Sequence, residues 1–362
     1  MAKKVCMVVQ APNVMGGIAA VVNGYRHSCL EKDFQITFVE SYRNGGKVVK
    51  LLKAIKAYFV FFGIMLFHKP DLVHIHSSFG PSFYRKIPFI LMSNWFRIPV
   101  INHIHGADFN EFYMKADRTK KNRIKKIYNK CAKLIALSDE WKTQLSQVVP
   151  ADHIVVLENY SVLQDGETVH SNRNIVLFMG AIEERKGCFD VPQIFKRVSS
   201  EVPDCTLVMA GDGDDRIVKA VKESFGDSLN RNVFFPGWIR GDQRKQNLEE
   251  SDLFLLPSYN EGMPMAILDA MGYGLPIIST NVGGISKLVH EGENGFLCKP
   301  GDIEEFAEKI IYYLNNKEAR IEAGNVSKRI VRENYTLDKH LQQLERLYEE
   351  VMIDASNTKI HP

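Results

Sequence analysis

The chain has 362 residues, of which 45% are hydrophobic and 25% charged, and a formal net charge of +3. This length suffices for two domains of ordinary size, and the composition is that of a soluble globular protein. The six cysteines are scattered without a C-x-x-C pair, which argues against a disulfide framework or a cysteine zinc site. The apolar run at the N-terminus ends at Pro12 and is too short for a signal peptide, so we expect a cytoplasmic location.

Charge is distributed unevenly along the chain. Residues 1–165 carry 23 Lys and Arg against 12 Asp and Glu, whereas the remainder carries 23 against 31. A basic first half and an acidic second half indicate two domains with different partners. The basic half suits anionic lipid or a phosphorylated substrate. Nucleic acid is the competing interpretation, but no nucleic-acid-binding motif is present, and we expect no such partner.

The N-terminal segment predicts a strand, a glycine-rich turn and a helix. Lys4–Gln10 is an apolar strand, and the turn that follows contains Gly16 and Gly17 before a helix over Ala19–Leu30. Glycines at such a turn let the backbone approach a phosphate closely, next to a helix N-terminus. A plain turn explains the two glycines equally well.

Residues 47–67 predict a basic amphipathic helix. Lysines recur every third residue at Lys47, Lys50, Lys53 and Lys56, and the apolar run Ala57–Phe67 follows. This run is too short to span a bilayer. A helix of this kind can lie in a membrane interface through its basic and aromatic side chains. The alternative is a core helix with a solvated lysine edge.

Four histidines mark the ends of two predicted strands, Asp71–His76 and Pro99–His103. They are His74, His76, His103 and His105. Residues at i and i+2 share one face of a sheet, so a metal site is the alternative to structural histidines. Because Asp108 is the only carboxylate nearby, we expect no metal here.

A second α/β series begins after a polar linker at Gln164–Asn174. Short apolar runs alternate with helical sequence, as right-handed βαβ units require. These runs are Ile175–Met179, Thr206–Ala210, Val233–Phe235, Leu253–Leu256 and Pro276–Ser279. After the first run comes G-A-I-E-E-R-K-G, in which Arg185 and Lys186 stand at a strand–helix junction. Basic residues there can hold a diphosphate.

The stretch Pro257–Gly284 is the most informative part of the chain. The strand Leu253–Leu256 runs into a polar loop, and Pro264 fits the first position of the helix that ends at Gly272. The helix N-terminus thus lies at the carboxyl end of a strand, where such sheets bind ligands. The free backbone amides of the first helical turn can bind a phosphate there. Glu261 and Asp269 suit separated hydroxyl groups of one long ligand, such as a sugar nucleotide. The alternative is a helix-capping glutamate and a solvated aspartate.

These residues resemble a known family. The pattern P-S-x-x-E-G-M-P-x-x-x-L-D-A-M-x-x-G-x-P-I-I-S-T-x-x-G-G is similar to the donor-site signature of retaining nucleotide-sugar glycosyltransferases of family four. The resemblance implies the GT-B fold, an α/β fold with two Rossmann-like domains facing each other across a cleft. It divides the chain into an acceptor-side domain at 1–165, a donor domain at 172–335 and a helix at 336–354 that packs back on the first domain.

The resemblance also implies roles for individual residues. Glu261 and His105 are the expected catalytic residues, with His105 near the transferred sugar and Asp108 as its helper. Lys186 matches the family's lysine, and Arg185 substitutes for an arginine that is Ala181 here. The family's second acidic position is a glutamate, and here it is Asp269. The expected donor-binding residues are Gly16, Gly17, Arg185, Lys186, Trp238, Ile239, Glu261, Gly262, Met263, Pro264 and Asp269. Trp238 and Ile239 pack the nucleobase.

The predicted function is retaining transfer of a hexosyl or acetylhexosaminyl group from a UDP- or GDP-sugar. The expected acceptor is a glycan or a lipid-linked saccharide in cell-surface polysaccharide biosynthesis. We expect no metal and no cofactor, because the nucleotide sugar is a substrate. The protein is expected in the cytoplasm, with peripheral contact to anionic lipid on the inner face of the plasma membrane. The rival functions are a nucleotide-sugar 2-epimerase and a non-catalytic nucleotide-sugar-binding protein.

Overall fold

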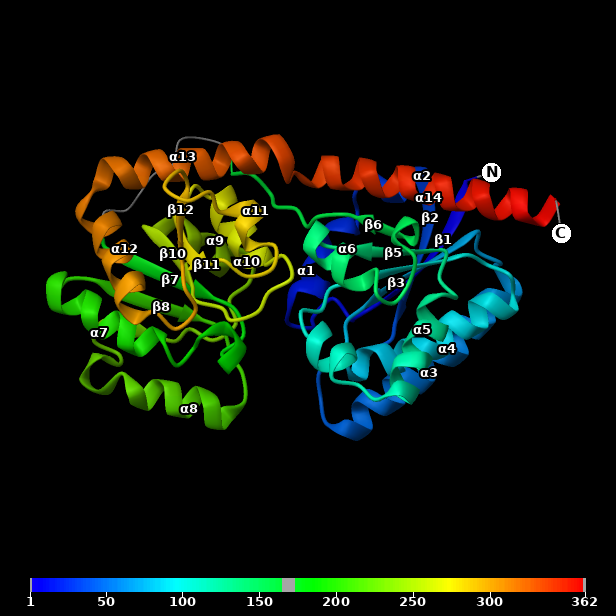
Figure 1. Ribbon diagram of the computed structural model, residues 1–362, viewed down its shortest axis with the longest axis horizontal. Helices are drawn as coiled ribbons and strands as arrows, with labels where there is room; N and C mark the ends of the chain where they lie inside the picture. The colour runs from blue at the N-terminus through cyan, green and yellow to red at the C-terminus, as the bar shows by residue number, and fades with distance from the viewer. Residues whose placement is uncertain (1, 165–172, 361–362) are drawn as a thin grey trace. The chain divides into compact units, whose positions relative to one another are not determined.

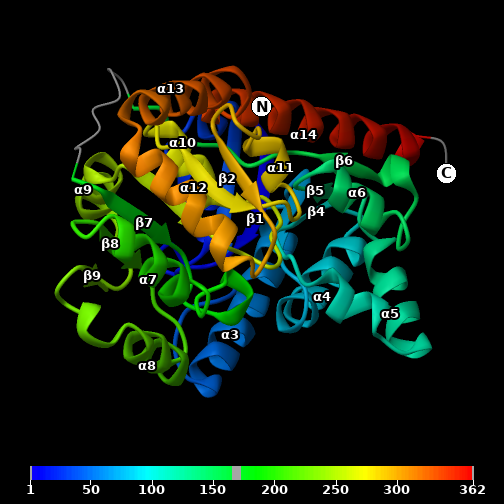
Figure 2. The same cartoon turned by 60° about the vertical axis from the view of Figure 1, so that its left-hand side comes forward.

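A computed structural model describes residues 2–164 and 173–360 of the chain (Figures 1 and 2). Residues 165–172, in the predicted linker Gln164–Asn174, lie outside this description. The chain divides into two compact units, Met1–Asn159 with Leu337–Pro362, and Tyr160–Thr336. The last segment of the chain therefore belongs to the same unit as the first half.

Unit 1 is built on a parallel sheet with strand order β2-β1-β3-β4-β5-β6. Its strands are β1 (Lys3–Val9), β2 (Phe34–Glu40), β3 (Leu72–Ser77), β4 (Val100–Ile104), β5 (Lys133–Ala136) and β6 (Ile154–Val156). Strands β3 and β4 are buried along their whole length, as expected where helices cover both faces of a parallel sheet.

Helices lie on both faces of the unit 1 sheet. They are α1 (Gly17–Tyr25), α2 (Leu30–Asp33), α3 (Lys47–Phe67), α4 (Pro81–Trp95), the π-helix η1 (Asn110–Met114), α5 (Arg118–Tyr128), α6 (Asp139–Leu145), the 3₁₀ turn η2 (Ala151–His153) and α14 (Leu337–Ile360).

The two faces of strand β3 contact different helices. Val73 and Ile75 join the apolar core formed with Phe61 of α3 and Phe89 of α4. His74 points to the opposite face, where its Nδ1 lies 2.5 Å from the hydroxyl of Tyr348 on α14. Figure 1 shows α3 and α4 below the sheet and α14 above it. The alternation of the strand thus separates an apolar face from a histidine face.

Unit 2 has a parallel sheet with order β12-β11-β10-β7-β8-β9. Counted within the unit, this is the 3-2-1-4-5-6 order of the dinucleotide-binding fold. Its strands are β7 (Ile175–Met179), β8 (Thr206–Ala210), β9 (Val233–Phe234), β10 (Leu253–Leu256), β11 (Ile277–Thr280) and β12 (Gly295–Cys298). The order reverses between β7 and β10, so ligand binding is expected at the carboxyl ends of these two strands.

The helical segments of unit 2 complete two covering layers. They are η3 (Glu184–Lys186), α7 (Val191–Glu201), α8 (Asp215–Ser224), η4 (Gly226–Ser228), α9 (Gly241–Glu250), α10 (Met265–Gly272), α11 (Ile285–Leu288), α12 (Ile303–Asn315) and α13 (Lys317–Asn334). Helix α12 packs on α7, and α10 packs on α13. The predicted fold class, two Rossmann-like α/β domains, is confirmed.

Several predicted boundaries need correction. The helix expected over Ala19–Leu30 ends at Tyr25, because His27 has a φ of 60° and breaks the helical backbone. The final helix was expected to end near residue 354 but continues to Ile360. Among the described residues, no helix combines the length and the apolar character needed to cross a membrane.

Candidate functional site

The candidate site lies where three loops of unit 2 follow neighbouring strands. The loop after β7 carries Arg185 and Lys186, the loop after β10 carries Glu261, and the loop after β11 carries Gly283. Strand β10 pairs with both β7 and β11 in parallel. The three loops therefore leave the sheet at the same edge, beside the point where the strand order reverses.

Two glycines allow these loops to pack closely. Gly187 has a φ of 69°, and a Cβ on it would lie 2.1 Å from the carbonyl oxygen of Pro257. Gly283 has a φ of 56°, and its Cβ would lie 1.9 Å from the carbonyl oxygen of Glu261. Any side chain would both strain the backbone and push the loops apart. The amide of Tyr259 donates to the carbonyl of Arg185 at 2.8 Å and fastens the first two loops together.

Glu261 is the centre of a charged cluster. Its side chain is only 6% exposed, and one carboxylate oxygen accepts hydrogen bonds from Lys186 Nζ and, at 2.8 Å, from Ser258 Oγ. Its other oxygen lies 3.7 Å from Arg185 Nη1. Two cations thus converge on one buried carboxylate at the strand ends. That arrangement suits an anion.

Arg185 is held on its other side by a second carboxylate. Its Nη2 lies 2.5 Å from Glu183 Oε1, and its Nη1 donates to the carbonyl of Asn260 at 2.6 Å. The Glu183 side chain is 40% exposed, far more than that of Glu261. Arg185 is therefore fixed in orientation between the loops after β7 and β10.

Asp269 lies on α10 and forms an ion pair with Arg244 of α9. Its side chain is 13% exposed. Burial raises the pKa of this carboxyl, and the charge and hydrogen bond of Arg244 oppose that rise. The residue is therefore partnered inside the protein, and the surface role considered from the sequence does not describe it.

Gly262, Met263 and Pro264 lead from Glu261 into α10 and are all buried. Pro264 is the residue immediately before the helix rather than its first residue. Trp238 and Ile239 follow the edge strand β9, with Trp238 half-buried and Ile239 buried.

Unit 1 holds the other predicted residues. Gly16 and Gly17 are exposed at the start of α1, where Gly16 has a φ of 120°. His105 follows β4 and is half-buried, with its Nε2 2.9 Å from Nδ1 of His76. Burial lowers the pKa of His105 to about 3, so the ring is neutral near pH 7. Asp108 is exposed and, within the described parts of the chain, makes no hydrogen bond or ion pair with His105.

The structure exposes much of the helix that carries the periodic lysines. Eight large apolar side chains of α3 are exposed, and we call them the α3 apolar face: Val48, Leu51, Leu52, Ile55, Phe59, Val60, Leu66 and Phe67. Phe59 and Phe67 are 75% and 82% exposed, and Trp95 of the neighbouring helix α4 is 74% exposed. The core-helix interpretation accounts for Phe61 and Ile64, which are buried, but not for this face.

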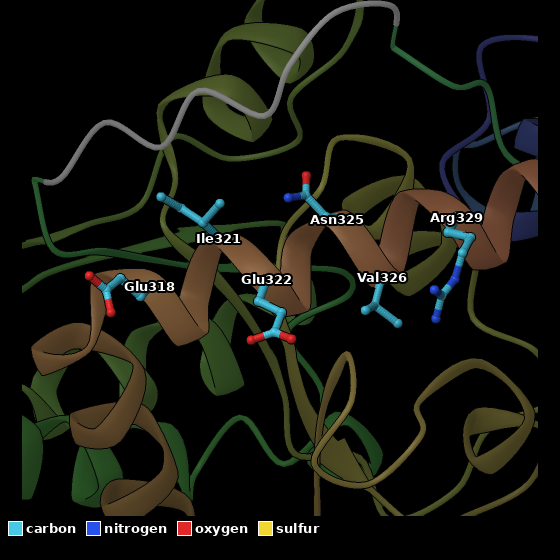
Figure 3. A pocket seen from close by; sticks show the side chains of 6 residues that line it. All are labelled: Glu318, Ile321, Glu322, Asn325, Val326 and Arg329. Atoms are coloured by element: carbon cyan, nitrogen blue, oxygen red, sulfur yellow. The ribbon is translucent and has the colours of Figure 1, made fainter.

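A surface hollow along α13 is a separate feature (Figure 3). Its lining residues are Glu318, Ile321, Glu322, Asn325, Val326 and Arg329. All six come from one helix and, as Figure 3 shows, do not converge on a common point. The hollow also lacks the strand ends and glycine loops that build the charged cluster. We therefore locate the candidate donor site at the strand ends.

Sequence reasoning missed three partners of the site. Ser258 stands in the quoted motif, and its spacing of three from Glu261 is the signal that identifies it. Glu183 lies two residues from Arg185 and was visible in the same loop. Arg244 lies 25 residues before its partner Asp269, on a different helix, and no local pattern in the sequence reveals that pair.

Comparison with known proteins agrees with this architecture. Residues 163–329 match the family described as glycosyl transferases group 1, and residues 27–160 match glycosyltransferase family 4. The chain is 26% identical over 304 residues to N-acetyl-alpha-D-glucosaminyl L-malate synthase of Bacillus anthracis, covering 80% of this chain and 77% of that one. It is 26% identical over 334 residues to UDP-Gal:alpha-D-GlcNAc-diphosphoundecaprenol alpha-1,3-galactosyltransferase of Escherichia coli. That match covers 84% of this chain and 82% of the relative.

A solved structure of S. aureus TarM, a mutant in complex with Fondaparinux, alpha-GlcNAc-glycerol and UDP, resembles this chain with a TM-score of 0.68. The identity is 18%, and the match covers 81% of this chain and 59% of TarM. Two Rossmann-like domains of this kind define the GT-B class of glycosyltransferases. Because glycosyltransferase families match both halves of the sequence, the chain belongs to glycosyltransferase family four. It is therefore a glycosyltransferase, which sets aside the epimerase and the non-catalytic binder.

Proposed function

We propose that the protein transfers a sugar, with retention of configuration, from a UDP- or GDP-sugar to a glycan or lipid-linked saccharide. The observation that carries this proposal is the cluster of Glu261, Lys186 and Arg185 at the reversal of strand order in unit 2. The relatives favour UDP, because one is named for UDP-Gal and the TarM complex contains UDP. Retention is proposed from family membership alone.

Lys186 and Arg185 bind the diphosphate in this proposal. Both cations contact Glu261, and a diphosphate offers oxygens that compete for them. The backbone at Gly262, Met263 and Pro264 approaches the same group at the start of α10. As the bond to the sugar breaks, charge develops on the leaving nucleoside diphosphate. A well-placed donor contributes about 3 kcal/mol to transition-state stabilisation, so these groups need no metal ion.

Once Lys186 and Arg185 contact the diphosphate, the carboxylate of Glu261 accepts hydrogen bonds from hydroxyl groups of the transferred sugar. The family resemblance supports a contact of His105 with the transferred sugar and of Gly16 and Gly17 with the donor. Trp238 and Ile239 pack the nucleobase. Asp269 binds the ribose, but its ion pair with Arg244 must first loosen or be shared. We therefore propose that Arg244 positions Asp269 for this contact.

The first test is product analysis of the purified protein with a panel of UDP- and GDP-sugars and membrane glycolipid. No metal ion is added, and each assay is run both with and without EDTA. We expect free UDP or GDP to appear only when glycolipid is added, together with a glycolipid that has gained one sugar of the same anomeric configuration. Turnover that requires added Mg²⁺ or Mn²⁺ would contradict the metal-independent mechanism. Inversion at the anomeric carbon would contradict retention.

The proposed acceptor surface is in unit 1. The α3 apolar face stands beside exposed Lys47 and Lys56 and half-exposed Lys50, and Trp95 extends it. Figures 1 and 2 show α3 and α4 side by side at the edge of their unit, and Phe62 of α3 lies 6.2 Å from Trp95 between ring centroids. Exposed aromatic side chains flanked by lysines favour binding at the interface of an anionic membrane. We propose that this surface brings the cytoplasmic enzyme to a lipid-linked acceptor on the inner membrane face.

Charge reversal of Lys47, Lys50 and Lys56 to Glu is expected to weaken binding to phosphatidylglycerol vesicles at least about 100-fold. Lys53 is left intact because its Nζ pairs with Glu40 at 2.9 Å. Vesicle flotation measures the binding. The matched control reverses three exposed lysines of unit 2, Lys196, Lys219 and Lys245. Equal binding by the two variants, or no loss in the first, would contradict the membrane proposal.

A further inference from the structure

Three buried histidines meet on one face of the unit 1 sheet. His74 and His76 belong to β3, His103 belongs to β4, and His76 and His103 are direct register partners. All three side chains are fully buried. One ring nitrogen from each lies within 4.8 Å of those of the other two. Parallel pairing and the i, i+2 spacing bring the three rings together.

Most ring nitrogens of this cluster have no partner among the described residues. They are His74 Nε2, His76 Nε2, His103 Nδ1 and His103 Nε2. Buried polar atoms are nearly always hydrogen-bonded or bound to an ion or water, so four of them in one place need an explanation. The remaining nitrogens of the cluster are engaged, His74 Nδ1 with Tyr348 and His76 Nδ1 with His105.

These two contacts prepare the free nitrogens to bind a metal. If each Nδ1–H donates, to Tyr348 at 2.5 Å and to His105 at 2.9 Å, the lone pairs of His74 Nε2 and His76 Nε2 are left available. Metal-binding histidines commonly donate their second ring nitrogen in this way. A neutral imidazole is the form that binds a metal ion.

We propose that His74, His76 and His103 bind a divalent transition-metal ion, for which an all-imidazole ligand set favours Zn²⁺. This replaces the sequence-based expectation that these histidines bind no metal. Lys86 is also buried, and its Nζ donates to Val8 O at 3.2 Å and to Ser41 Oγ at 2.7 Å. The proposal does not rest on the proposed sugar transfer.

The ion would have a structural role and a positioning role. It would join β3 to β4 and, through His74 and Tyr348, orient the C-terminal helix α14 on the sheet. Through His76 it would fix the ring of His105, whose Nε2 lies 2.9 Å from Nδ1 of His76. His105 touches the sugar in the proposed function, and His76 acts on it only as a positioning residue.

The test is metal analysis of the full chain, expressed without a histidine tag and purified without chelators. We expect about one zinc per chain. His103→Leu removes two nitrogens that have no partner in the described part of the chain, so it should fold while losing the zinc. His290→Ala, an exposed histidine in unit 2, should keep it. Zinc should raise the melting temperature of metal-stripped wild type but leave His103→Leu unchanged.

Cobalt substitution gives a second measurement that does not require any variant to fold. Co²⁺ added to metal-stripped wild type should give the visible absorption bands of a four-coordinate site, and zinc should abolish them. Wild type that holds no zinc as purified, and takes up neither ion at stoichiometric concentration, would overturn the proposal. So would equal zinc content in wild type and folded His103→Leu. Because metal content is measured without substrate, it is independent of the transferase assay.

Discussion

Glu261→Gln is expected to lower kcat/KM at least about 100-fold while the protein remains folded. The neutral amide removes the buried charge that faces Lys186 and Arg185, and it replaces one acceptor oxygen of the sugar contact by an NH₂ group. Lys186 would then lose its carboxylate partner, whereas Arg185 would keep Glu183. Steady-state kinetics with varied donor measure the effect, and circular dichroism and the melting temperature check the fold.

The matched control for this variant is Glu183→Gln. Glu183 contacts the same arginine as Glu261, but its side chain is 40% exposed against 6%. An exposed carboxylate contributes little to an ion pair, so we expect less than about a fivefold change. Similar losses in the two variants would mean that only the orientation of Arg185 matters. Activity of Glu261→Gln close to wild type would contradict a role for Glu261 in transfer.

The loops of the candidate site were predictable because local chemistry determines them. Gly187 and Gly283 have left-handed backbone conformations, and a Cβ at either position would collide with a neighbouring loop. Glycine is therefore required there, and its positions in the sequence predict the turns. The apolar runs of β7, β10 and β11 are short, and turn residues bound them on both sides. Sequence alone therefore indicated which loops follow strands. The alternation of strands and helices indicated βαβ units, whereas the arrangement in two Rossmann-like domains came from the family resemblance.

Contacts between distant elements were not predictable. The pairing of Asp269 with Arg244 depends on how α10 and α9 lie on the sheet, and the aspartate alone gives no sign of it. Lysines spaced by three residues drift around a helix, so the pattern of α3 did not decide which side is buried. The structure buries Ala54, Ala57 and Phe61 and exposes Phe59.

The histidine cluster falls between these two cases. The i, i+2 spacing predicted that the members of each strand share a face. The sequence did not reveal that His76 and His103 are register partners or that Tyr348 of α14 closes the group. A sheet face covered by helices buries its side chains irrespective of their polarity. As a result, four ring nitrogens have no hydrogen-bond partner among the described residues. Their clustering can be recognised only once the register of β3 and β4 is known.

His105→Ala is expected to lower kcat about 100-fold and to leave the dissociation constant of UDP unchanged. His105 belongs to unit 1, whereas the groups proposed to bind the nucleotide, Arg185 and Lys186, belong to unit 2. Loss of a contact to the transferred sugar misplaces the reacting carbon, and small misplacements cost rate of this order. Calorimetric titration with UDP and single-turnover kinetics with the full donor measure the two quantities.

Conservative variants separate the role of His105 from a structural one. Because the ring is held neutral, His105→Gln, which keeps an uncharged donor and acceptor, should recover part of the rate. His68→Ala, an exposed histidine of the same unit, should change neither quantity. His105→Ala should also keep its zinc, since His105 is not one of the three proposed ligands. A weaker UDP affinity with an unchanged kcat would instead mean that His105 supports the nucleotide, and its proposed place at the sugar would be wrong.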